Sequence, residues 1–115
     1  MSPEILLKSL SDQTRLRCMM LLMQEGELCV CELTHALELI QPKISRHLAS
    51  LREMQVVSDR RAGQWIYYSI NPSLPAWANE LLQATLKGIK NENQFRDDIK
   101  KLKTMANRPE NRMCA

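Results

Sequence analysis

Apolar residues near the start of the chain recur every three or four positions, which is the spacing of an amphipathic helix. The segment LRCMMLLMQE carries this pattern, after Ser11 and Asp12 and before Gly26. A small polar residue before an apolar run and a glycine after it are typical helix start and stop signals. We therefore expect a capped helix over residues 12–25 and a shorter helix over residues 3–9. The apolar face of the longer helix consists of Leu16, Met19, Met20 and Met23.

Two further helical segments follow with almost no linker. CELTHALE occupies residues 31–38, and PKISRHLASLRE begins at Pro42, after a junction at Leu39 and Ile40. Proline suits the first turn of a helix because its missing N–H would have no partner there. Two helices joined so tightly are typical of a helix-turn-helix. The predicted buried stripe of the second helix is Ile44, Leu48 and Leu51.

The apolar pattern changes to a period of two after Met54, and such alternation predicts β-strands. VVSDRRA and QWIYYSI are the two alternating segments, and Gly63 lies between them. The residues next to this glycine include a pair of arginines. The pattern predicts a β-hairpin with a basic tip.

A last apolar stripe lies beyond the hairpin. Pro72 and Pro75 bracket the start of a helix over roughly residues 74–90, whose apolar side chains recur at helical spacing. A chain this short has little core left for them, so we expect the stripe to pack against a second subunit. From Asn91 onward the sequence is polar and highly charged.

These elements together predict a mainly α fold with a β-hairpin wing, the winged helix-turn-helix, assembled as a homodimer. Residues 1–90 form the expected DNA-binding and dimerisation domain. Residues 91–115 form a charged C-terminal extension, partly helical or disordered. The usual work of this fold is to read duplex DNA, and a protein-interaction module is the alternative.

Composition narrows the class of protein further. A chain of 115 residues corresponds to one domain, and its N-terminus has no apolar run suited to a signal peptide or a membrane span. We therefore expect a cytoplasmic protein with no membrane partner and with reduced thiols. The net charge of +3 does not by itself require nucleic acid as a partner. The local distribution of charge is the better guide to whether the protein binds nucleic acid.

Basic residues concentrate on the helix-turn-helix and the wing. Gln41 can address an adenine edge, Lys43 and Arg46 can address a guanine or a phosphate, and Ser45 suits a phosphate oxygen. The weaker alternative for this surface is a solvated basic helix face. For His47, a partly buried hydrogen-bonding residue explains the sequence as well as a DNA contact does. The predicted contacts to double-stranded operator DNA are Gln41, Lys43, Ser45, Arg46, His47, Arg60, Arg61 and Gln64.

Five segments in order, SDQTRLRCMMLL, GELCVCEL, QPKISRHLASLRE, RRAGQWIYYSI and PSLPAW, resemble the ArsR (ArsR/SmtB) family of metal-responsive repressors. The match covers about residues 5–85. QPKISRHL marks the family, and ELCVCEL marks its arsenic-responsive branch. The resemblance implies a homodimeric repressor whose first and last helices form the dimer interface, and which leaves its operator when an inducer binds.

Cys29 and Cys31 are the candidate ligands for that inducer, because thiolates select soft ions and trivalent arsenic and antimony are thiophilic. Residues i and i+2 of an intact helix point about 200° apart. Both sulfur atoms can reach one ion only if the backbone is not helical there. Either Cys29 lies before the helix start, or binding unwinds the first turn.

A third ligand is open. In the arsenic branch a third cysteine commonly follows three residues after the second, and Thr34 occupies that position here. An external thiol or hydroxide can complete the site, or a third sulfur can come from elsewhere. Cys114 is the freest candidate, whereas Cys18, inside the apolar helix, reads as a small core residue.

Other functions fit the residues less well. The only histidines are His35 and His47, which excludes the imidazole site that a zinc, cobalt or nickel sensor of this family places on its last helix. A thiol-based redox or persulfide-responsive repressor of the same fold remains the main alternative. A thiol oxidoreductase is disfavoured because the CVC segment lacks the βαβ context of such motifs. We therefore expect As(III) or Sb(III) as inducer, no catalytic cofactor and no enzymatic activity.

Overall fold

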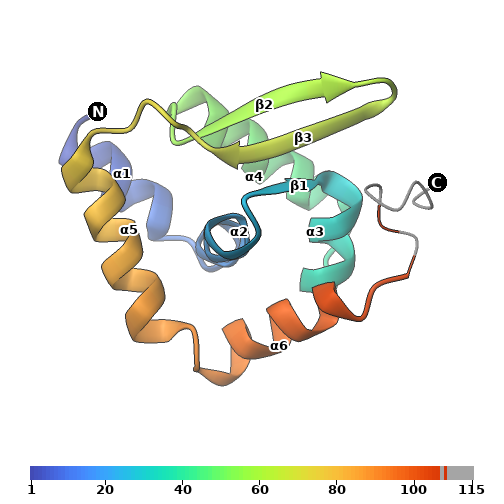
Figure 1. The fold of residues 1–115 in the computed structure, drawn as a ribbon. Helices are drawn as coiled ribbons and strands as arrows, with labels where there is room; N and C mark the ends of the chain where they lie inside the picture. The colour runs from blue at the N-terminus through green and yellow to red at the C-terminus, as the bar shows by residue number, and fades with distance from the viewer. Residues whose placement is uncertain (107, 109–115) are drawn as a thin grey trace.

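The computed structural model describes residues 1–106 and 108. Helix α2 runs through the middle of the fold, the hairpin lies over one side and α6 crosses the other (Figure 1). The described residues form a mainly helical fold with a small antiparallel sheet. In chain order the elements are α1 (Pro3–Leu10), α2 (Gln13–Glu25), β1 (Glu27–Cys29), α3 (Val30–Leu37), α4 (Gln41–Glu53), β2 (Val57–Ala62), β3 (Trp65–Ile70), α5 (Ala76–Ile89) and α6 (Asn93–Lys103).

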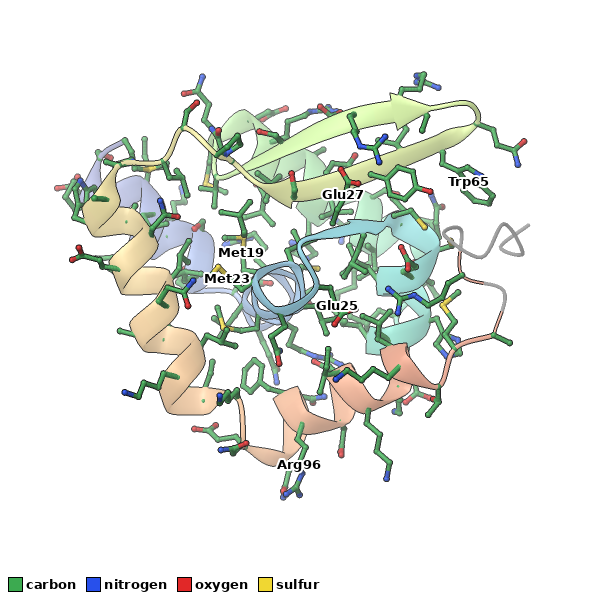
Figure 2. The ribbon with its side chains drawn as sticks, viewed as in Figure 1. Met19, Met23, Glu25, Glu27, Trp65 and Arg96 are labelled. Carbon is green, nitrogen blue, oxygen red and sulfur yellow. The ribbon has the colours of Figure 1, made fainter. Side chains whose placement is uncertain are left out.

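The central helix α2 begins and ends as its sequence predicts. The Asp12 carboxylate accepts a hydrogen bond from the Arg15 backbone N–H at 3.0 Å, which satisfies a donor at the helix start. Gly26 ends the helix with φ of 87°, a conformation that costs glycine little. Met19 and Met23 point from α2 toward α5 (Figure 2).

The helix-turn-helix consists of α3 and α4, as predicted. The three residues of the predicted α4 stripe are fully buried against the core, and they are Ile44, Leu48 and Leu51. Glu38 ends α3 in the left-handed region, with φ of 55°. Ile40 then precedes α4 without making a side-chain cap, and its side chain is 70% exposed.

The sheet contains one strand that the pattern did not predict. Strands β2 and β3 form the expected hairpin, and β1 pairs with the other edge of β3, giving the order β1-β3-β2. Cys29 is paired with Tyr67 in this register. Because a three-residue strand carries almost no periodic signal, only the structure reveals that the first thiol belongs to a sheet.

The C-terminal extension includes the helix α6, which packs on α2 and α3. Its buried residues are Phe95, Asp98 and Leu102. The Arg17 guanidinium donates to both Asp98 carboxylate oxygens, at 2.9 and 2.8 Å, and to the Leu37 carbonyl at 3.0 Å. Arg17 therefore ties α2, α6 and the end of α3 together.

Exposed apolar side chains concentrate on α1 and α5. Ile5 and Leu7 on α1 and Trp77 on α5 are 40%, 55% and 39% exposed. The two helices lie on the same side of the molecule (Figure 1). No helix in the described part of the chain is long and apolar enough to cross a membrane.

Candidate metalloid site and nucleic-acid interface

Cys29 and Cys31 lie where β1 passes into α3. Cys29 is the last residue of β1 and the N-cap of α3, with extended backbone (φ −90°, ψ 169°), whereas Cys31 lies in the first turn. Their Sγ atoms are 2.7 Å apart, which is longer than the roughly 2.05 Å of an S–S bond. Of the two alternatives drawn from the spacing, the structure shows the first: the helix starts after Cys29, and no unwinding is needed.

Glu32 holds this helix start in place. Its side chain is buried, and its Oε1 accepts a hydrogen bond from the Cys29 backbone N–H at 2.9 Å. Its Oε2 accepts from Arg108 Nε at 2.6 Å. Sequence reasoning missed both residues. A glutamate three positions after an N-cap is the signal for the first contact, but nothing local signals a partner 76 residues away.

The environment of Cys29 opposes ionisation. The pKa of the Cys29 thiol is raised to about 11, chiefly by burial. The nearby Glu32 carboxylate contributes to the increase, whereas backbone hydrogen bonds act in the opposite direction. A thiophilic ion must therefore displace a proton from this sulfur. Cys18 is fully buried on α2, and burial raises its pKa to about 12, in line with a core role.

Within residues 1–106 and 108, no three His, Cys, Asp or Glu side chains gather in a way that could hold a metal ion. Thr34 lies three residues after Cys31, on the same face of α3. Its Oγ1 is buried, and it has no hydrogen-bond partner among the described residues. Cys114, predicted as a possible third ligand, lies outside the described residues.

A cavity of about 570 Å³ opens beside the thiols. It lies between α3, the start of α4 and the tip of the hairpin, where Trp65 projects beneath the wing toward the start of α3 (Figure 2). Both predicted inducer ligands and two predicted DNA contacts, Gln41 and Gln64, therefore line the same cavity. Its described lining residues are Cys29, Val30, Cys31, Thr34, His35, Gln41, Gln64, Trp65 and Ile66.

The basic residues of α4 and the hairpin divide into two groups according to whether they form ion pairs. Arg52 pairs with Asp59 at 2.9 Å, and Arg60 pairs with Glu27 at 2.7 Å while its guanidinium lies 4.7 Å from the centre of the Tyr67 ring. Among the described residues, the other three cations have no carboxylate partner within an ion-pair distance, and they are Lys43, Arg46 and Arg61. These three are the better placed to meet phosphate.

The polar residues of α4 that are predicted to contact DNA differ in how exposed they are. The Gln41 side-chain amide donates to Ser45 Oγ at 2.9 Å on the exposed surface. His47, by contrast, is 13% exposed, and its Nε2 lies 3.9 Å from an Asp12 carboxylate oxygen. Burial lowers the pKa of His47, and the Asp12 charge partly offsets this. Its surroundings favour the partly buried alternative over a DNA contact.

A helix-turn-helix followed by a basic hairpin, with two cysteines at its start, defines a winged-helix transcriptional regulator. The comparisons with known proteins agree. The family model described as "Bacterial regulatory protein, arsR family" matches residues 12–59, and the chain belongs to this family.

The relatives also indicate the branch. The chain is 52% identical over 112 residues to the arsenic resistance transcriptional regulator ArsR1 of Pseudomonas putida, covering 96% of this chain and 84% of the relative. Among solved structures, HlyU from Vibrio cholerae is 29% identical, with a TM-score of 0.67 over 75% of this chain and 89% of that one. The AntR antimony-specific transcriptional repressor is 28% identical, with a TM-score of 0.65 over 79% of each chain.

These findings confirm the predicted fold and the predicted class of protein. The chain is a DNA-binding transcriptional repressor of the arsenic-resistance type, and its relatives are regulators, not enzymes.

Proposed function

We propose that the protein is a homodimeric repressor that binds operator DNA and leaves it when trivalent arsenic or antimony binds Cys29 and Cys31. The observation that carries this proposal is the 2.7 Å separation of the two Sγ atoms at the start of α3. Two sulfur atoms so close, on backbone of different kinds, suit a single thiophilic ion.

The position of the thiols supplies the coupling to DNA. They lie at the N-terminal end of α3, and only three residues separate the C-terminal end of α3 from α4. An ion that pulls Cys29 and Cys31 to its own bond lengths acts on the capping contact between Glu32 and the Cys29 backbone. A shift of α3 moves the start of α4 and the cavity wall formed by Gln41. Allosteric couplings of this kind typically amount to about 1–3 kcal/mol.

The exposed apolar residues of α1 and α5 support the dimer. Ile5, Leu7 and Trp77 form part of an apolar surface that two copies can bury against each other. A two-fold dimer would place one α4 helix in each of two major grooves of a palindromic operator. The α4 residues Gln41, Lys43, Ser45 and Arg46 would then face the DNA, and Arg61 and Gln64 would approach it from the wing.

A gel shift during an arsenite titration monitors the release of a palindromic operator fragment and so tests the assigned ligands. Cys29→Ser and Cys31→Ser should bind DNA like the wild type and should not be released by arsenite. Cys18→Ala is the matched control, and it should still respond. If either serine variant dissociates at the wild-type arsenite concentration, the ligand assignment is wrong.

A second function deserves the same assay because the two sulfur atoms are so close. Oxidation of a cysteine pair can release DNA without any metalloid, as a redox-responsive repressor would. Peroxide titrated beside arsenite separates the two functions. Release by peroxide with no response to arsenite would favour the redox repressor.

A further inference from the structure

An exposed apolar side chain lies in the turn of the helix-turn-helix, directly before α4. Ile40 is 70% exposed, the largest fraction among the exposed large apolar residues of the described chain. Three of the others lie on α1 and α5, and they are Ile5, Leu7 and Trp77. Helix α4 begins beside α3, away from α1 and α5 (Figure 1). Ile40 is therefore separate from the apolar surface assigned to the dimer.

Isoleucine is an unfavourable residue for the N-cap of α4. Ile40 has extended backbone (φ −71°, ψ 147°) and makes no side-chain cap. Ser, Thr, Asp and Asn are preferred at such positions because their side chains accept a backbone hydrogen bond, as Ser2 and Asp12 do at the starts of α1 and α2. Ile40 also leaves apolar surface in water. Residues that break local rules in this way concentrate at functional positions.

The backbone of Ile40 is firmly held. Its carbonyl oxygen accepts hydrogen bonds from the backbone N–H groups of Lys43 and Ile44, at 3.1 and 3.2 Å. Ile44 is fully buried, and Leu39, on the other side of Ile40, packs against the core. A β-branched side chain also has few rotamers. Ile40 therefore presents its methyl groups in a restricted set of directions, and a contact costs it little conformational entropy.

We propose that Ile40 contacts the 5-methyl group of a thymine in the major groove and so helps to select the operator sequence. The inference rests on the proposed function, because it requires α4 to enter the groove. The N-terminal residues of a recognition helix contact base edges, and Ile40 directly precedes them. Among the four bases only thymine presents a methyl group in the major groove. An apolar side chain that buries this methyl group distinguishes thymine from the other bases.

The neighbours of Ile40 suit base edges as well. Gln41 is exposed, and a glutamine amide matches the major-groove edge of adenine, the partner of thymine. Pro42, the second residue of α4, is also exposed and adds a further apolar group. This uncharged run suits bases, whereas Lys43 and Arg46, further along α4, suit phosphate.

Replacement of thymine by deoxyuridine tests this inference, because it removes the 5-methyl group and leaves base pairing unchanged. Each thymine of a labelled palindromic operator is replaced symmetrically in both half-sites, and fluorescence anisotropy measures the affinity of the full-length protein without inducer. For the wild type we expect one position at which replacement weakens binding by about tenfold, or roughly threefold for each methyl group. Ile40→Ser should bind the thymine and uracil operators of that pair equally.

The serine variant is suitable because its folding is not at risk. Serine supplies the missing cap of α4, so the midpoint of urea unfolding should rise, while the affinity for the thymine operator falls. Ile40→Val keeps a β-branched apolar side chain and should retain most of the preference for thymine. A purely structural role for Ile40 would not give higher stability together with the loss of one base preference.

Arg46→Ala separates failure of this inference from failure of the proposed function. This variant should bind every operator more weakly by a similar factor and should keep the preference for thymine. If Arg46→Ala weakens binding but no thymine depends on Ile40, the inference is wrong and α4 remains the reading helix. An equal loss on uracil replacement in the wild type and in Ile40→Ser also overturns it, because the methyl group then acts through DNA shape. If neither Arg46→Ala nor Ile40→Ser changes the affinity for any operator, the inference fails together with the proposed placement of α4 in the groove.

Discussion

Both helices of the helix-turn-helix bury apolar residues in the core, including Leu33, Ala36 and Leu37 of α3, but the start of α3 is held by a different kind of contact from α4. Helix α4 is held by its own apolar stripe, whose residues are fully buried, and its cations Lys43 and Arg46 follow from the same helical period. The start of α3 depends instead on a short strand, on Glu32 and on Arg108, which lies 76 residues away from that glutamate.

That difference suits the two tasks of a repressor. A reading helix works best when its position is fixed, because each base contact depends on geometry. A sensing element must have an alternative arrangement that a ligand can favour. At the start of α3 a few polar contacts hold the thiols, and such contacts can be exchanged for bonds to an ion at moderate cost. The contrast can be tested at both helices.

The largest expected effect comes from the distant contact at α3. Arg108→Gln removes the charged partner of a buried carboxylate, and it should lower the free energy of unfolding by about 2 kcal/mol. Arg108 is partly exposed, so water limits the loss. Thermal unfolding monitored by circular dichroism measures the effect at neutral pH.

The matched control for this variant is Arg96→Gln on α6. Arg96 projects into solvent at the far side of the molecule (Figure 2), and its guanidinium donates only to Asn93 among the described residues. This control should unfold like the wild type. Equal stability of the two variants would mean that the contact to Glu32 does not hold the start of α3, and the contrast with α4 would weaken.

A smaller effect is expected at the reading helix. Arg46→Ala should weaken binding to operator DNA by about 1–2 kcal/mol, or roughly 5–30-fold, because it removes a cation facing the duplex. The loss should be the same with and without arsenite, since the role proposed for this residue is to contact DNA and not to bind the ion. Fluorescence anisotropy with a labelled operator, with Arg96→Ala as control, measures it. Unchanged affinity would place the contact elsewhere.

The same contrast explains what the sequence could predict. The sequence predicts the elements that depend on local periodicity. These are α2 with its caps, α4 with its buried stripe, and the hairpin around Gly63. These features depend on residues a few positions apart, which a single sequence displays.

The features that the sequence did not show depend on distant partners. Strand β1 is only three residues long and exists because β3 offers an edge. The ion pairs of Arg17 with Asp98 and of Arg108 with Glu32 join residues 81 and 76 positions apart. At the thiols, spacing correctly required non-helical backbone, but only the strand shows why Cys29 adopts it. Sequence reasoning thus singled out the two candidate ligands and missed the contacts that hold them in place.

His47 provides the smallest and most specific test of how α4 is anchored. Burial lowers its pKa below the usual value, whereas the Asp12 carboxylate acts in the opposite direction, and Arg15, Arg46 and Lys43 add to the lowering. Folding therefore favours the neutral imidazole. The stability that this group contributes is present above the unfolded pKa of about 6.5 and is lost as the pH falls through the lower folded value.

We therefore expect the wild type to lose stability between about pH 6.5 and 5, with His47→Gln losing measurably less over the same range. Urea unfolding at pH 7 and pH 5 measures the difference. His35→Gln, at an exposed histidine on α3, controls for the loss of a histidine elsewhere. Equal pH dependence in the wild type and in His47→Gln would mean that this imidazole is not held neutral against α2. It would then be available to DNA after all, as one of the two interpretations of the α4 sequence allows.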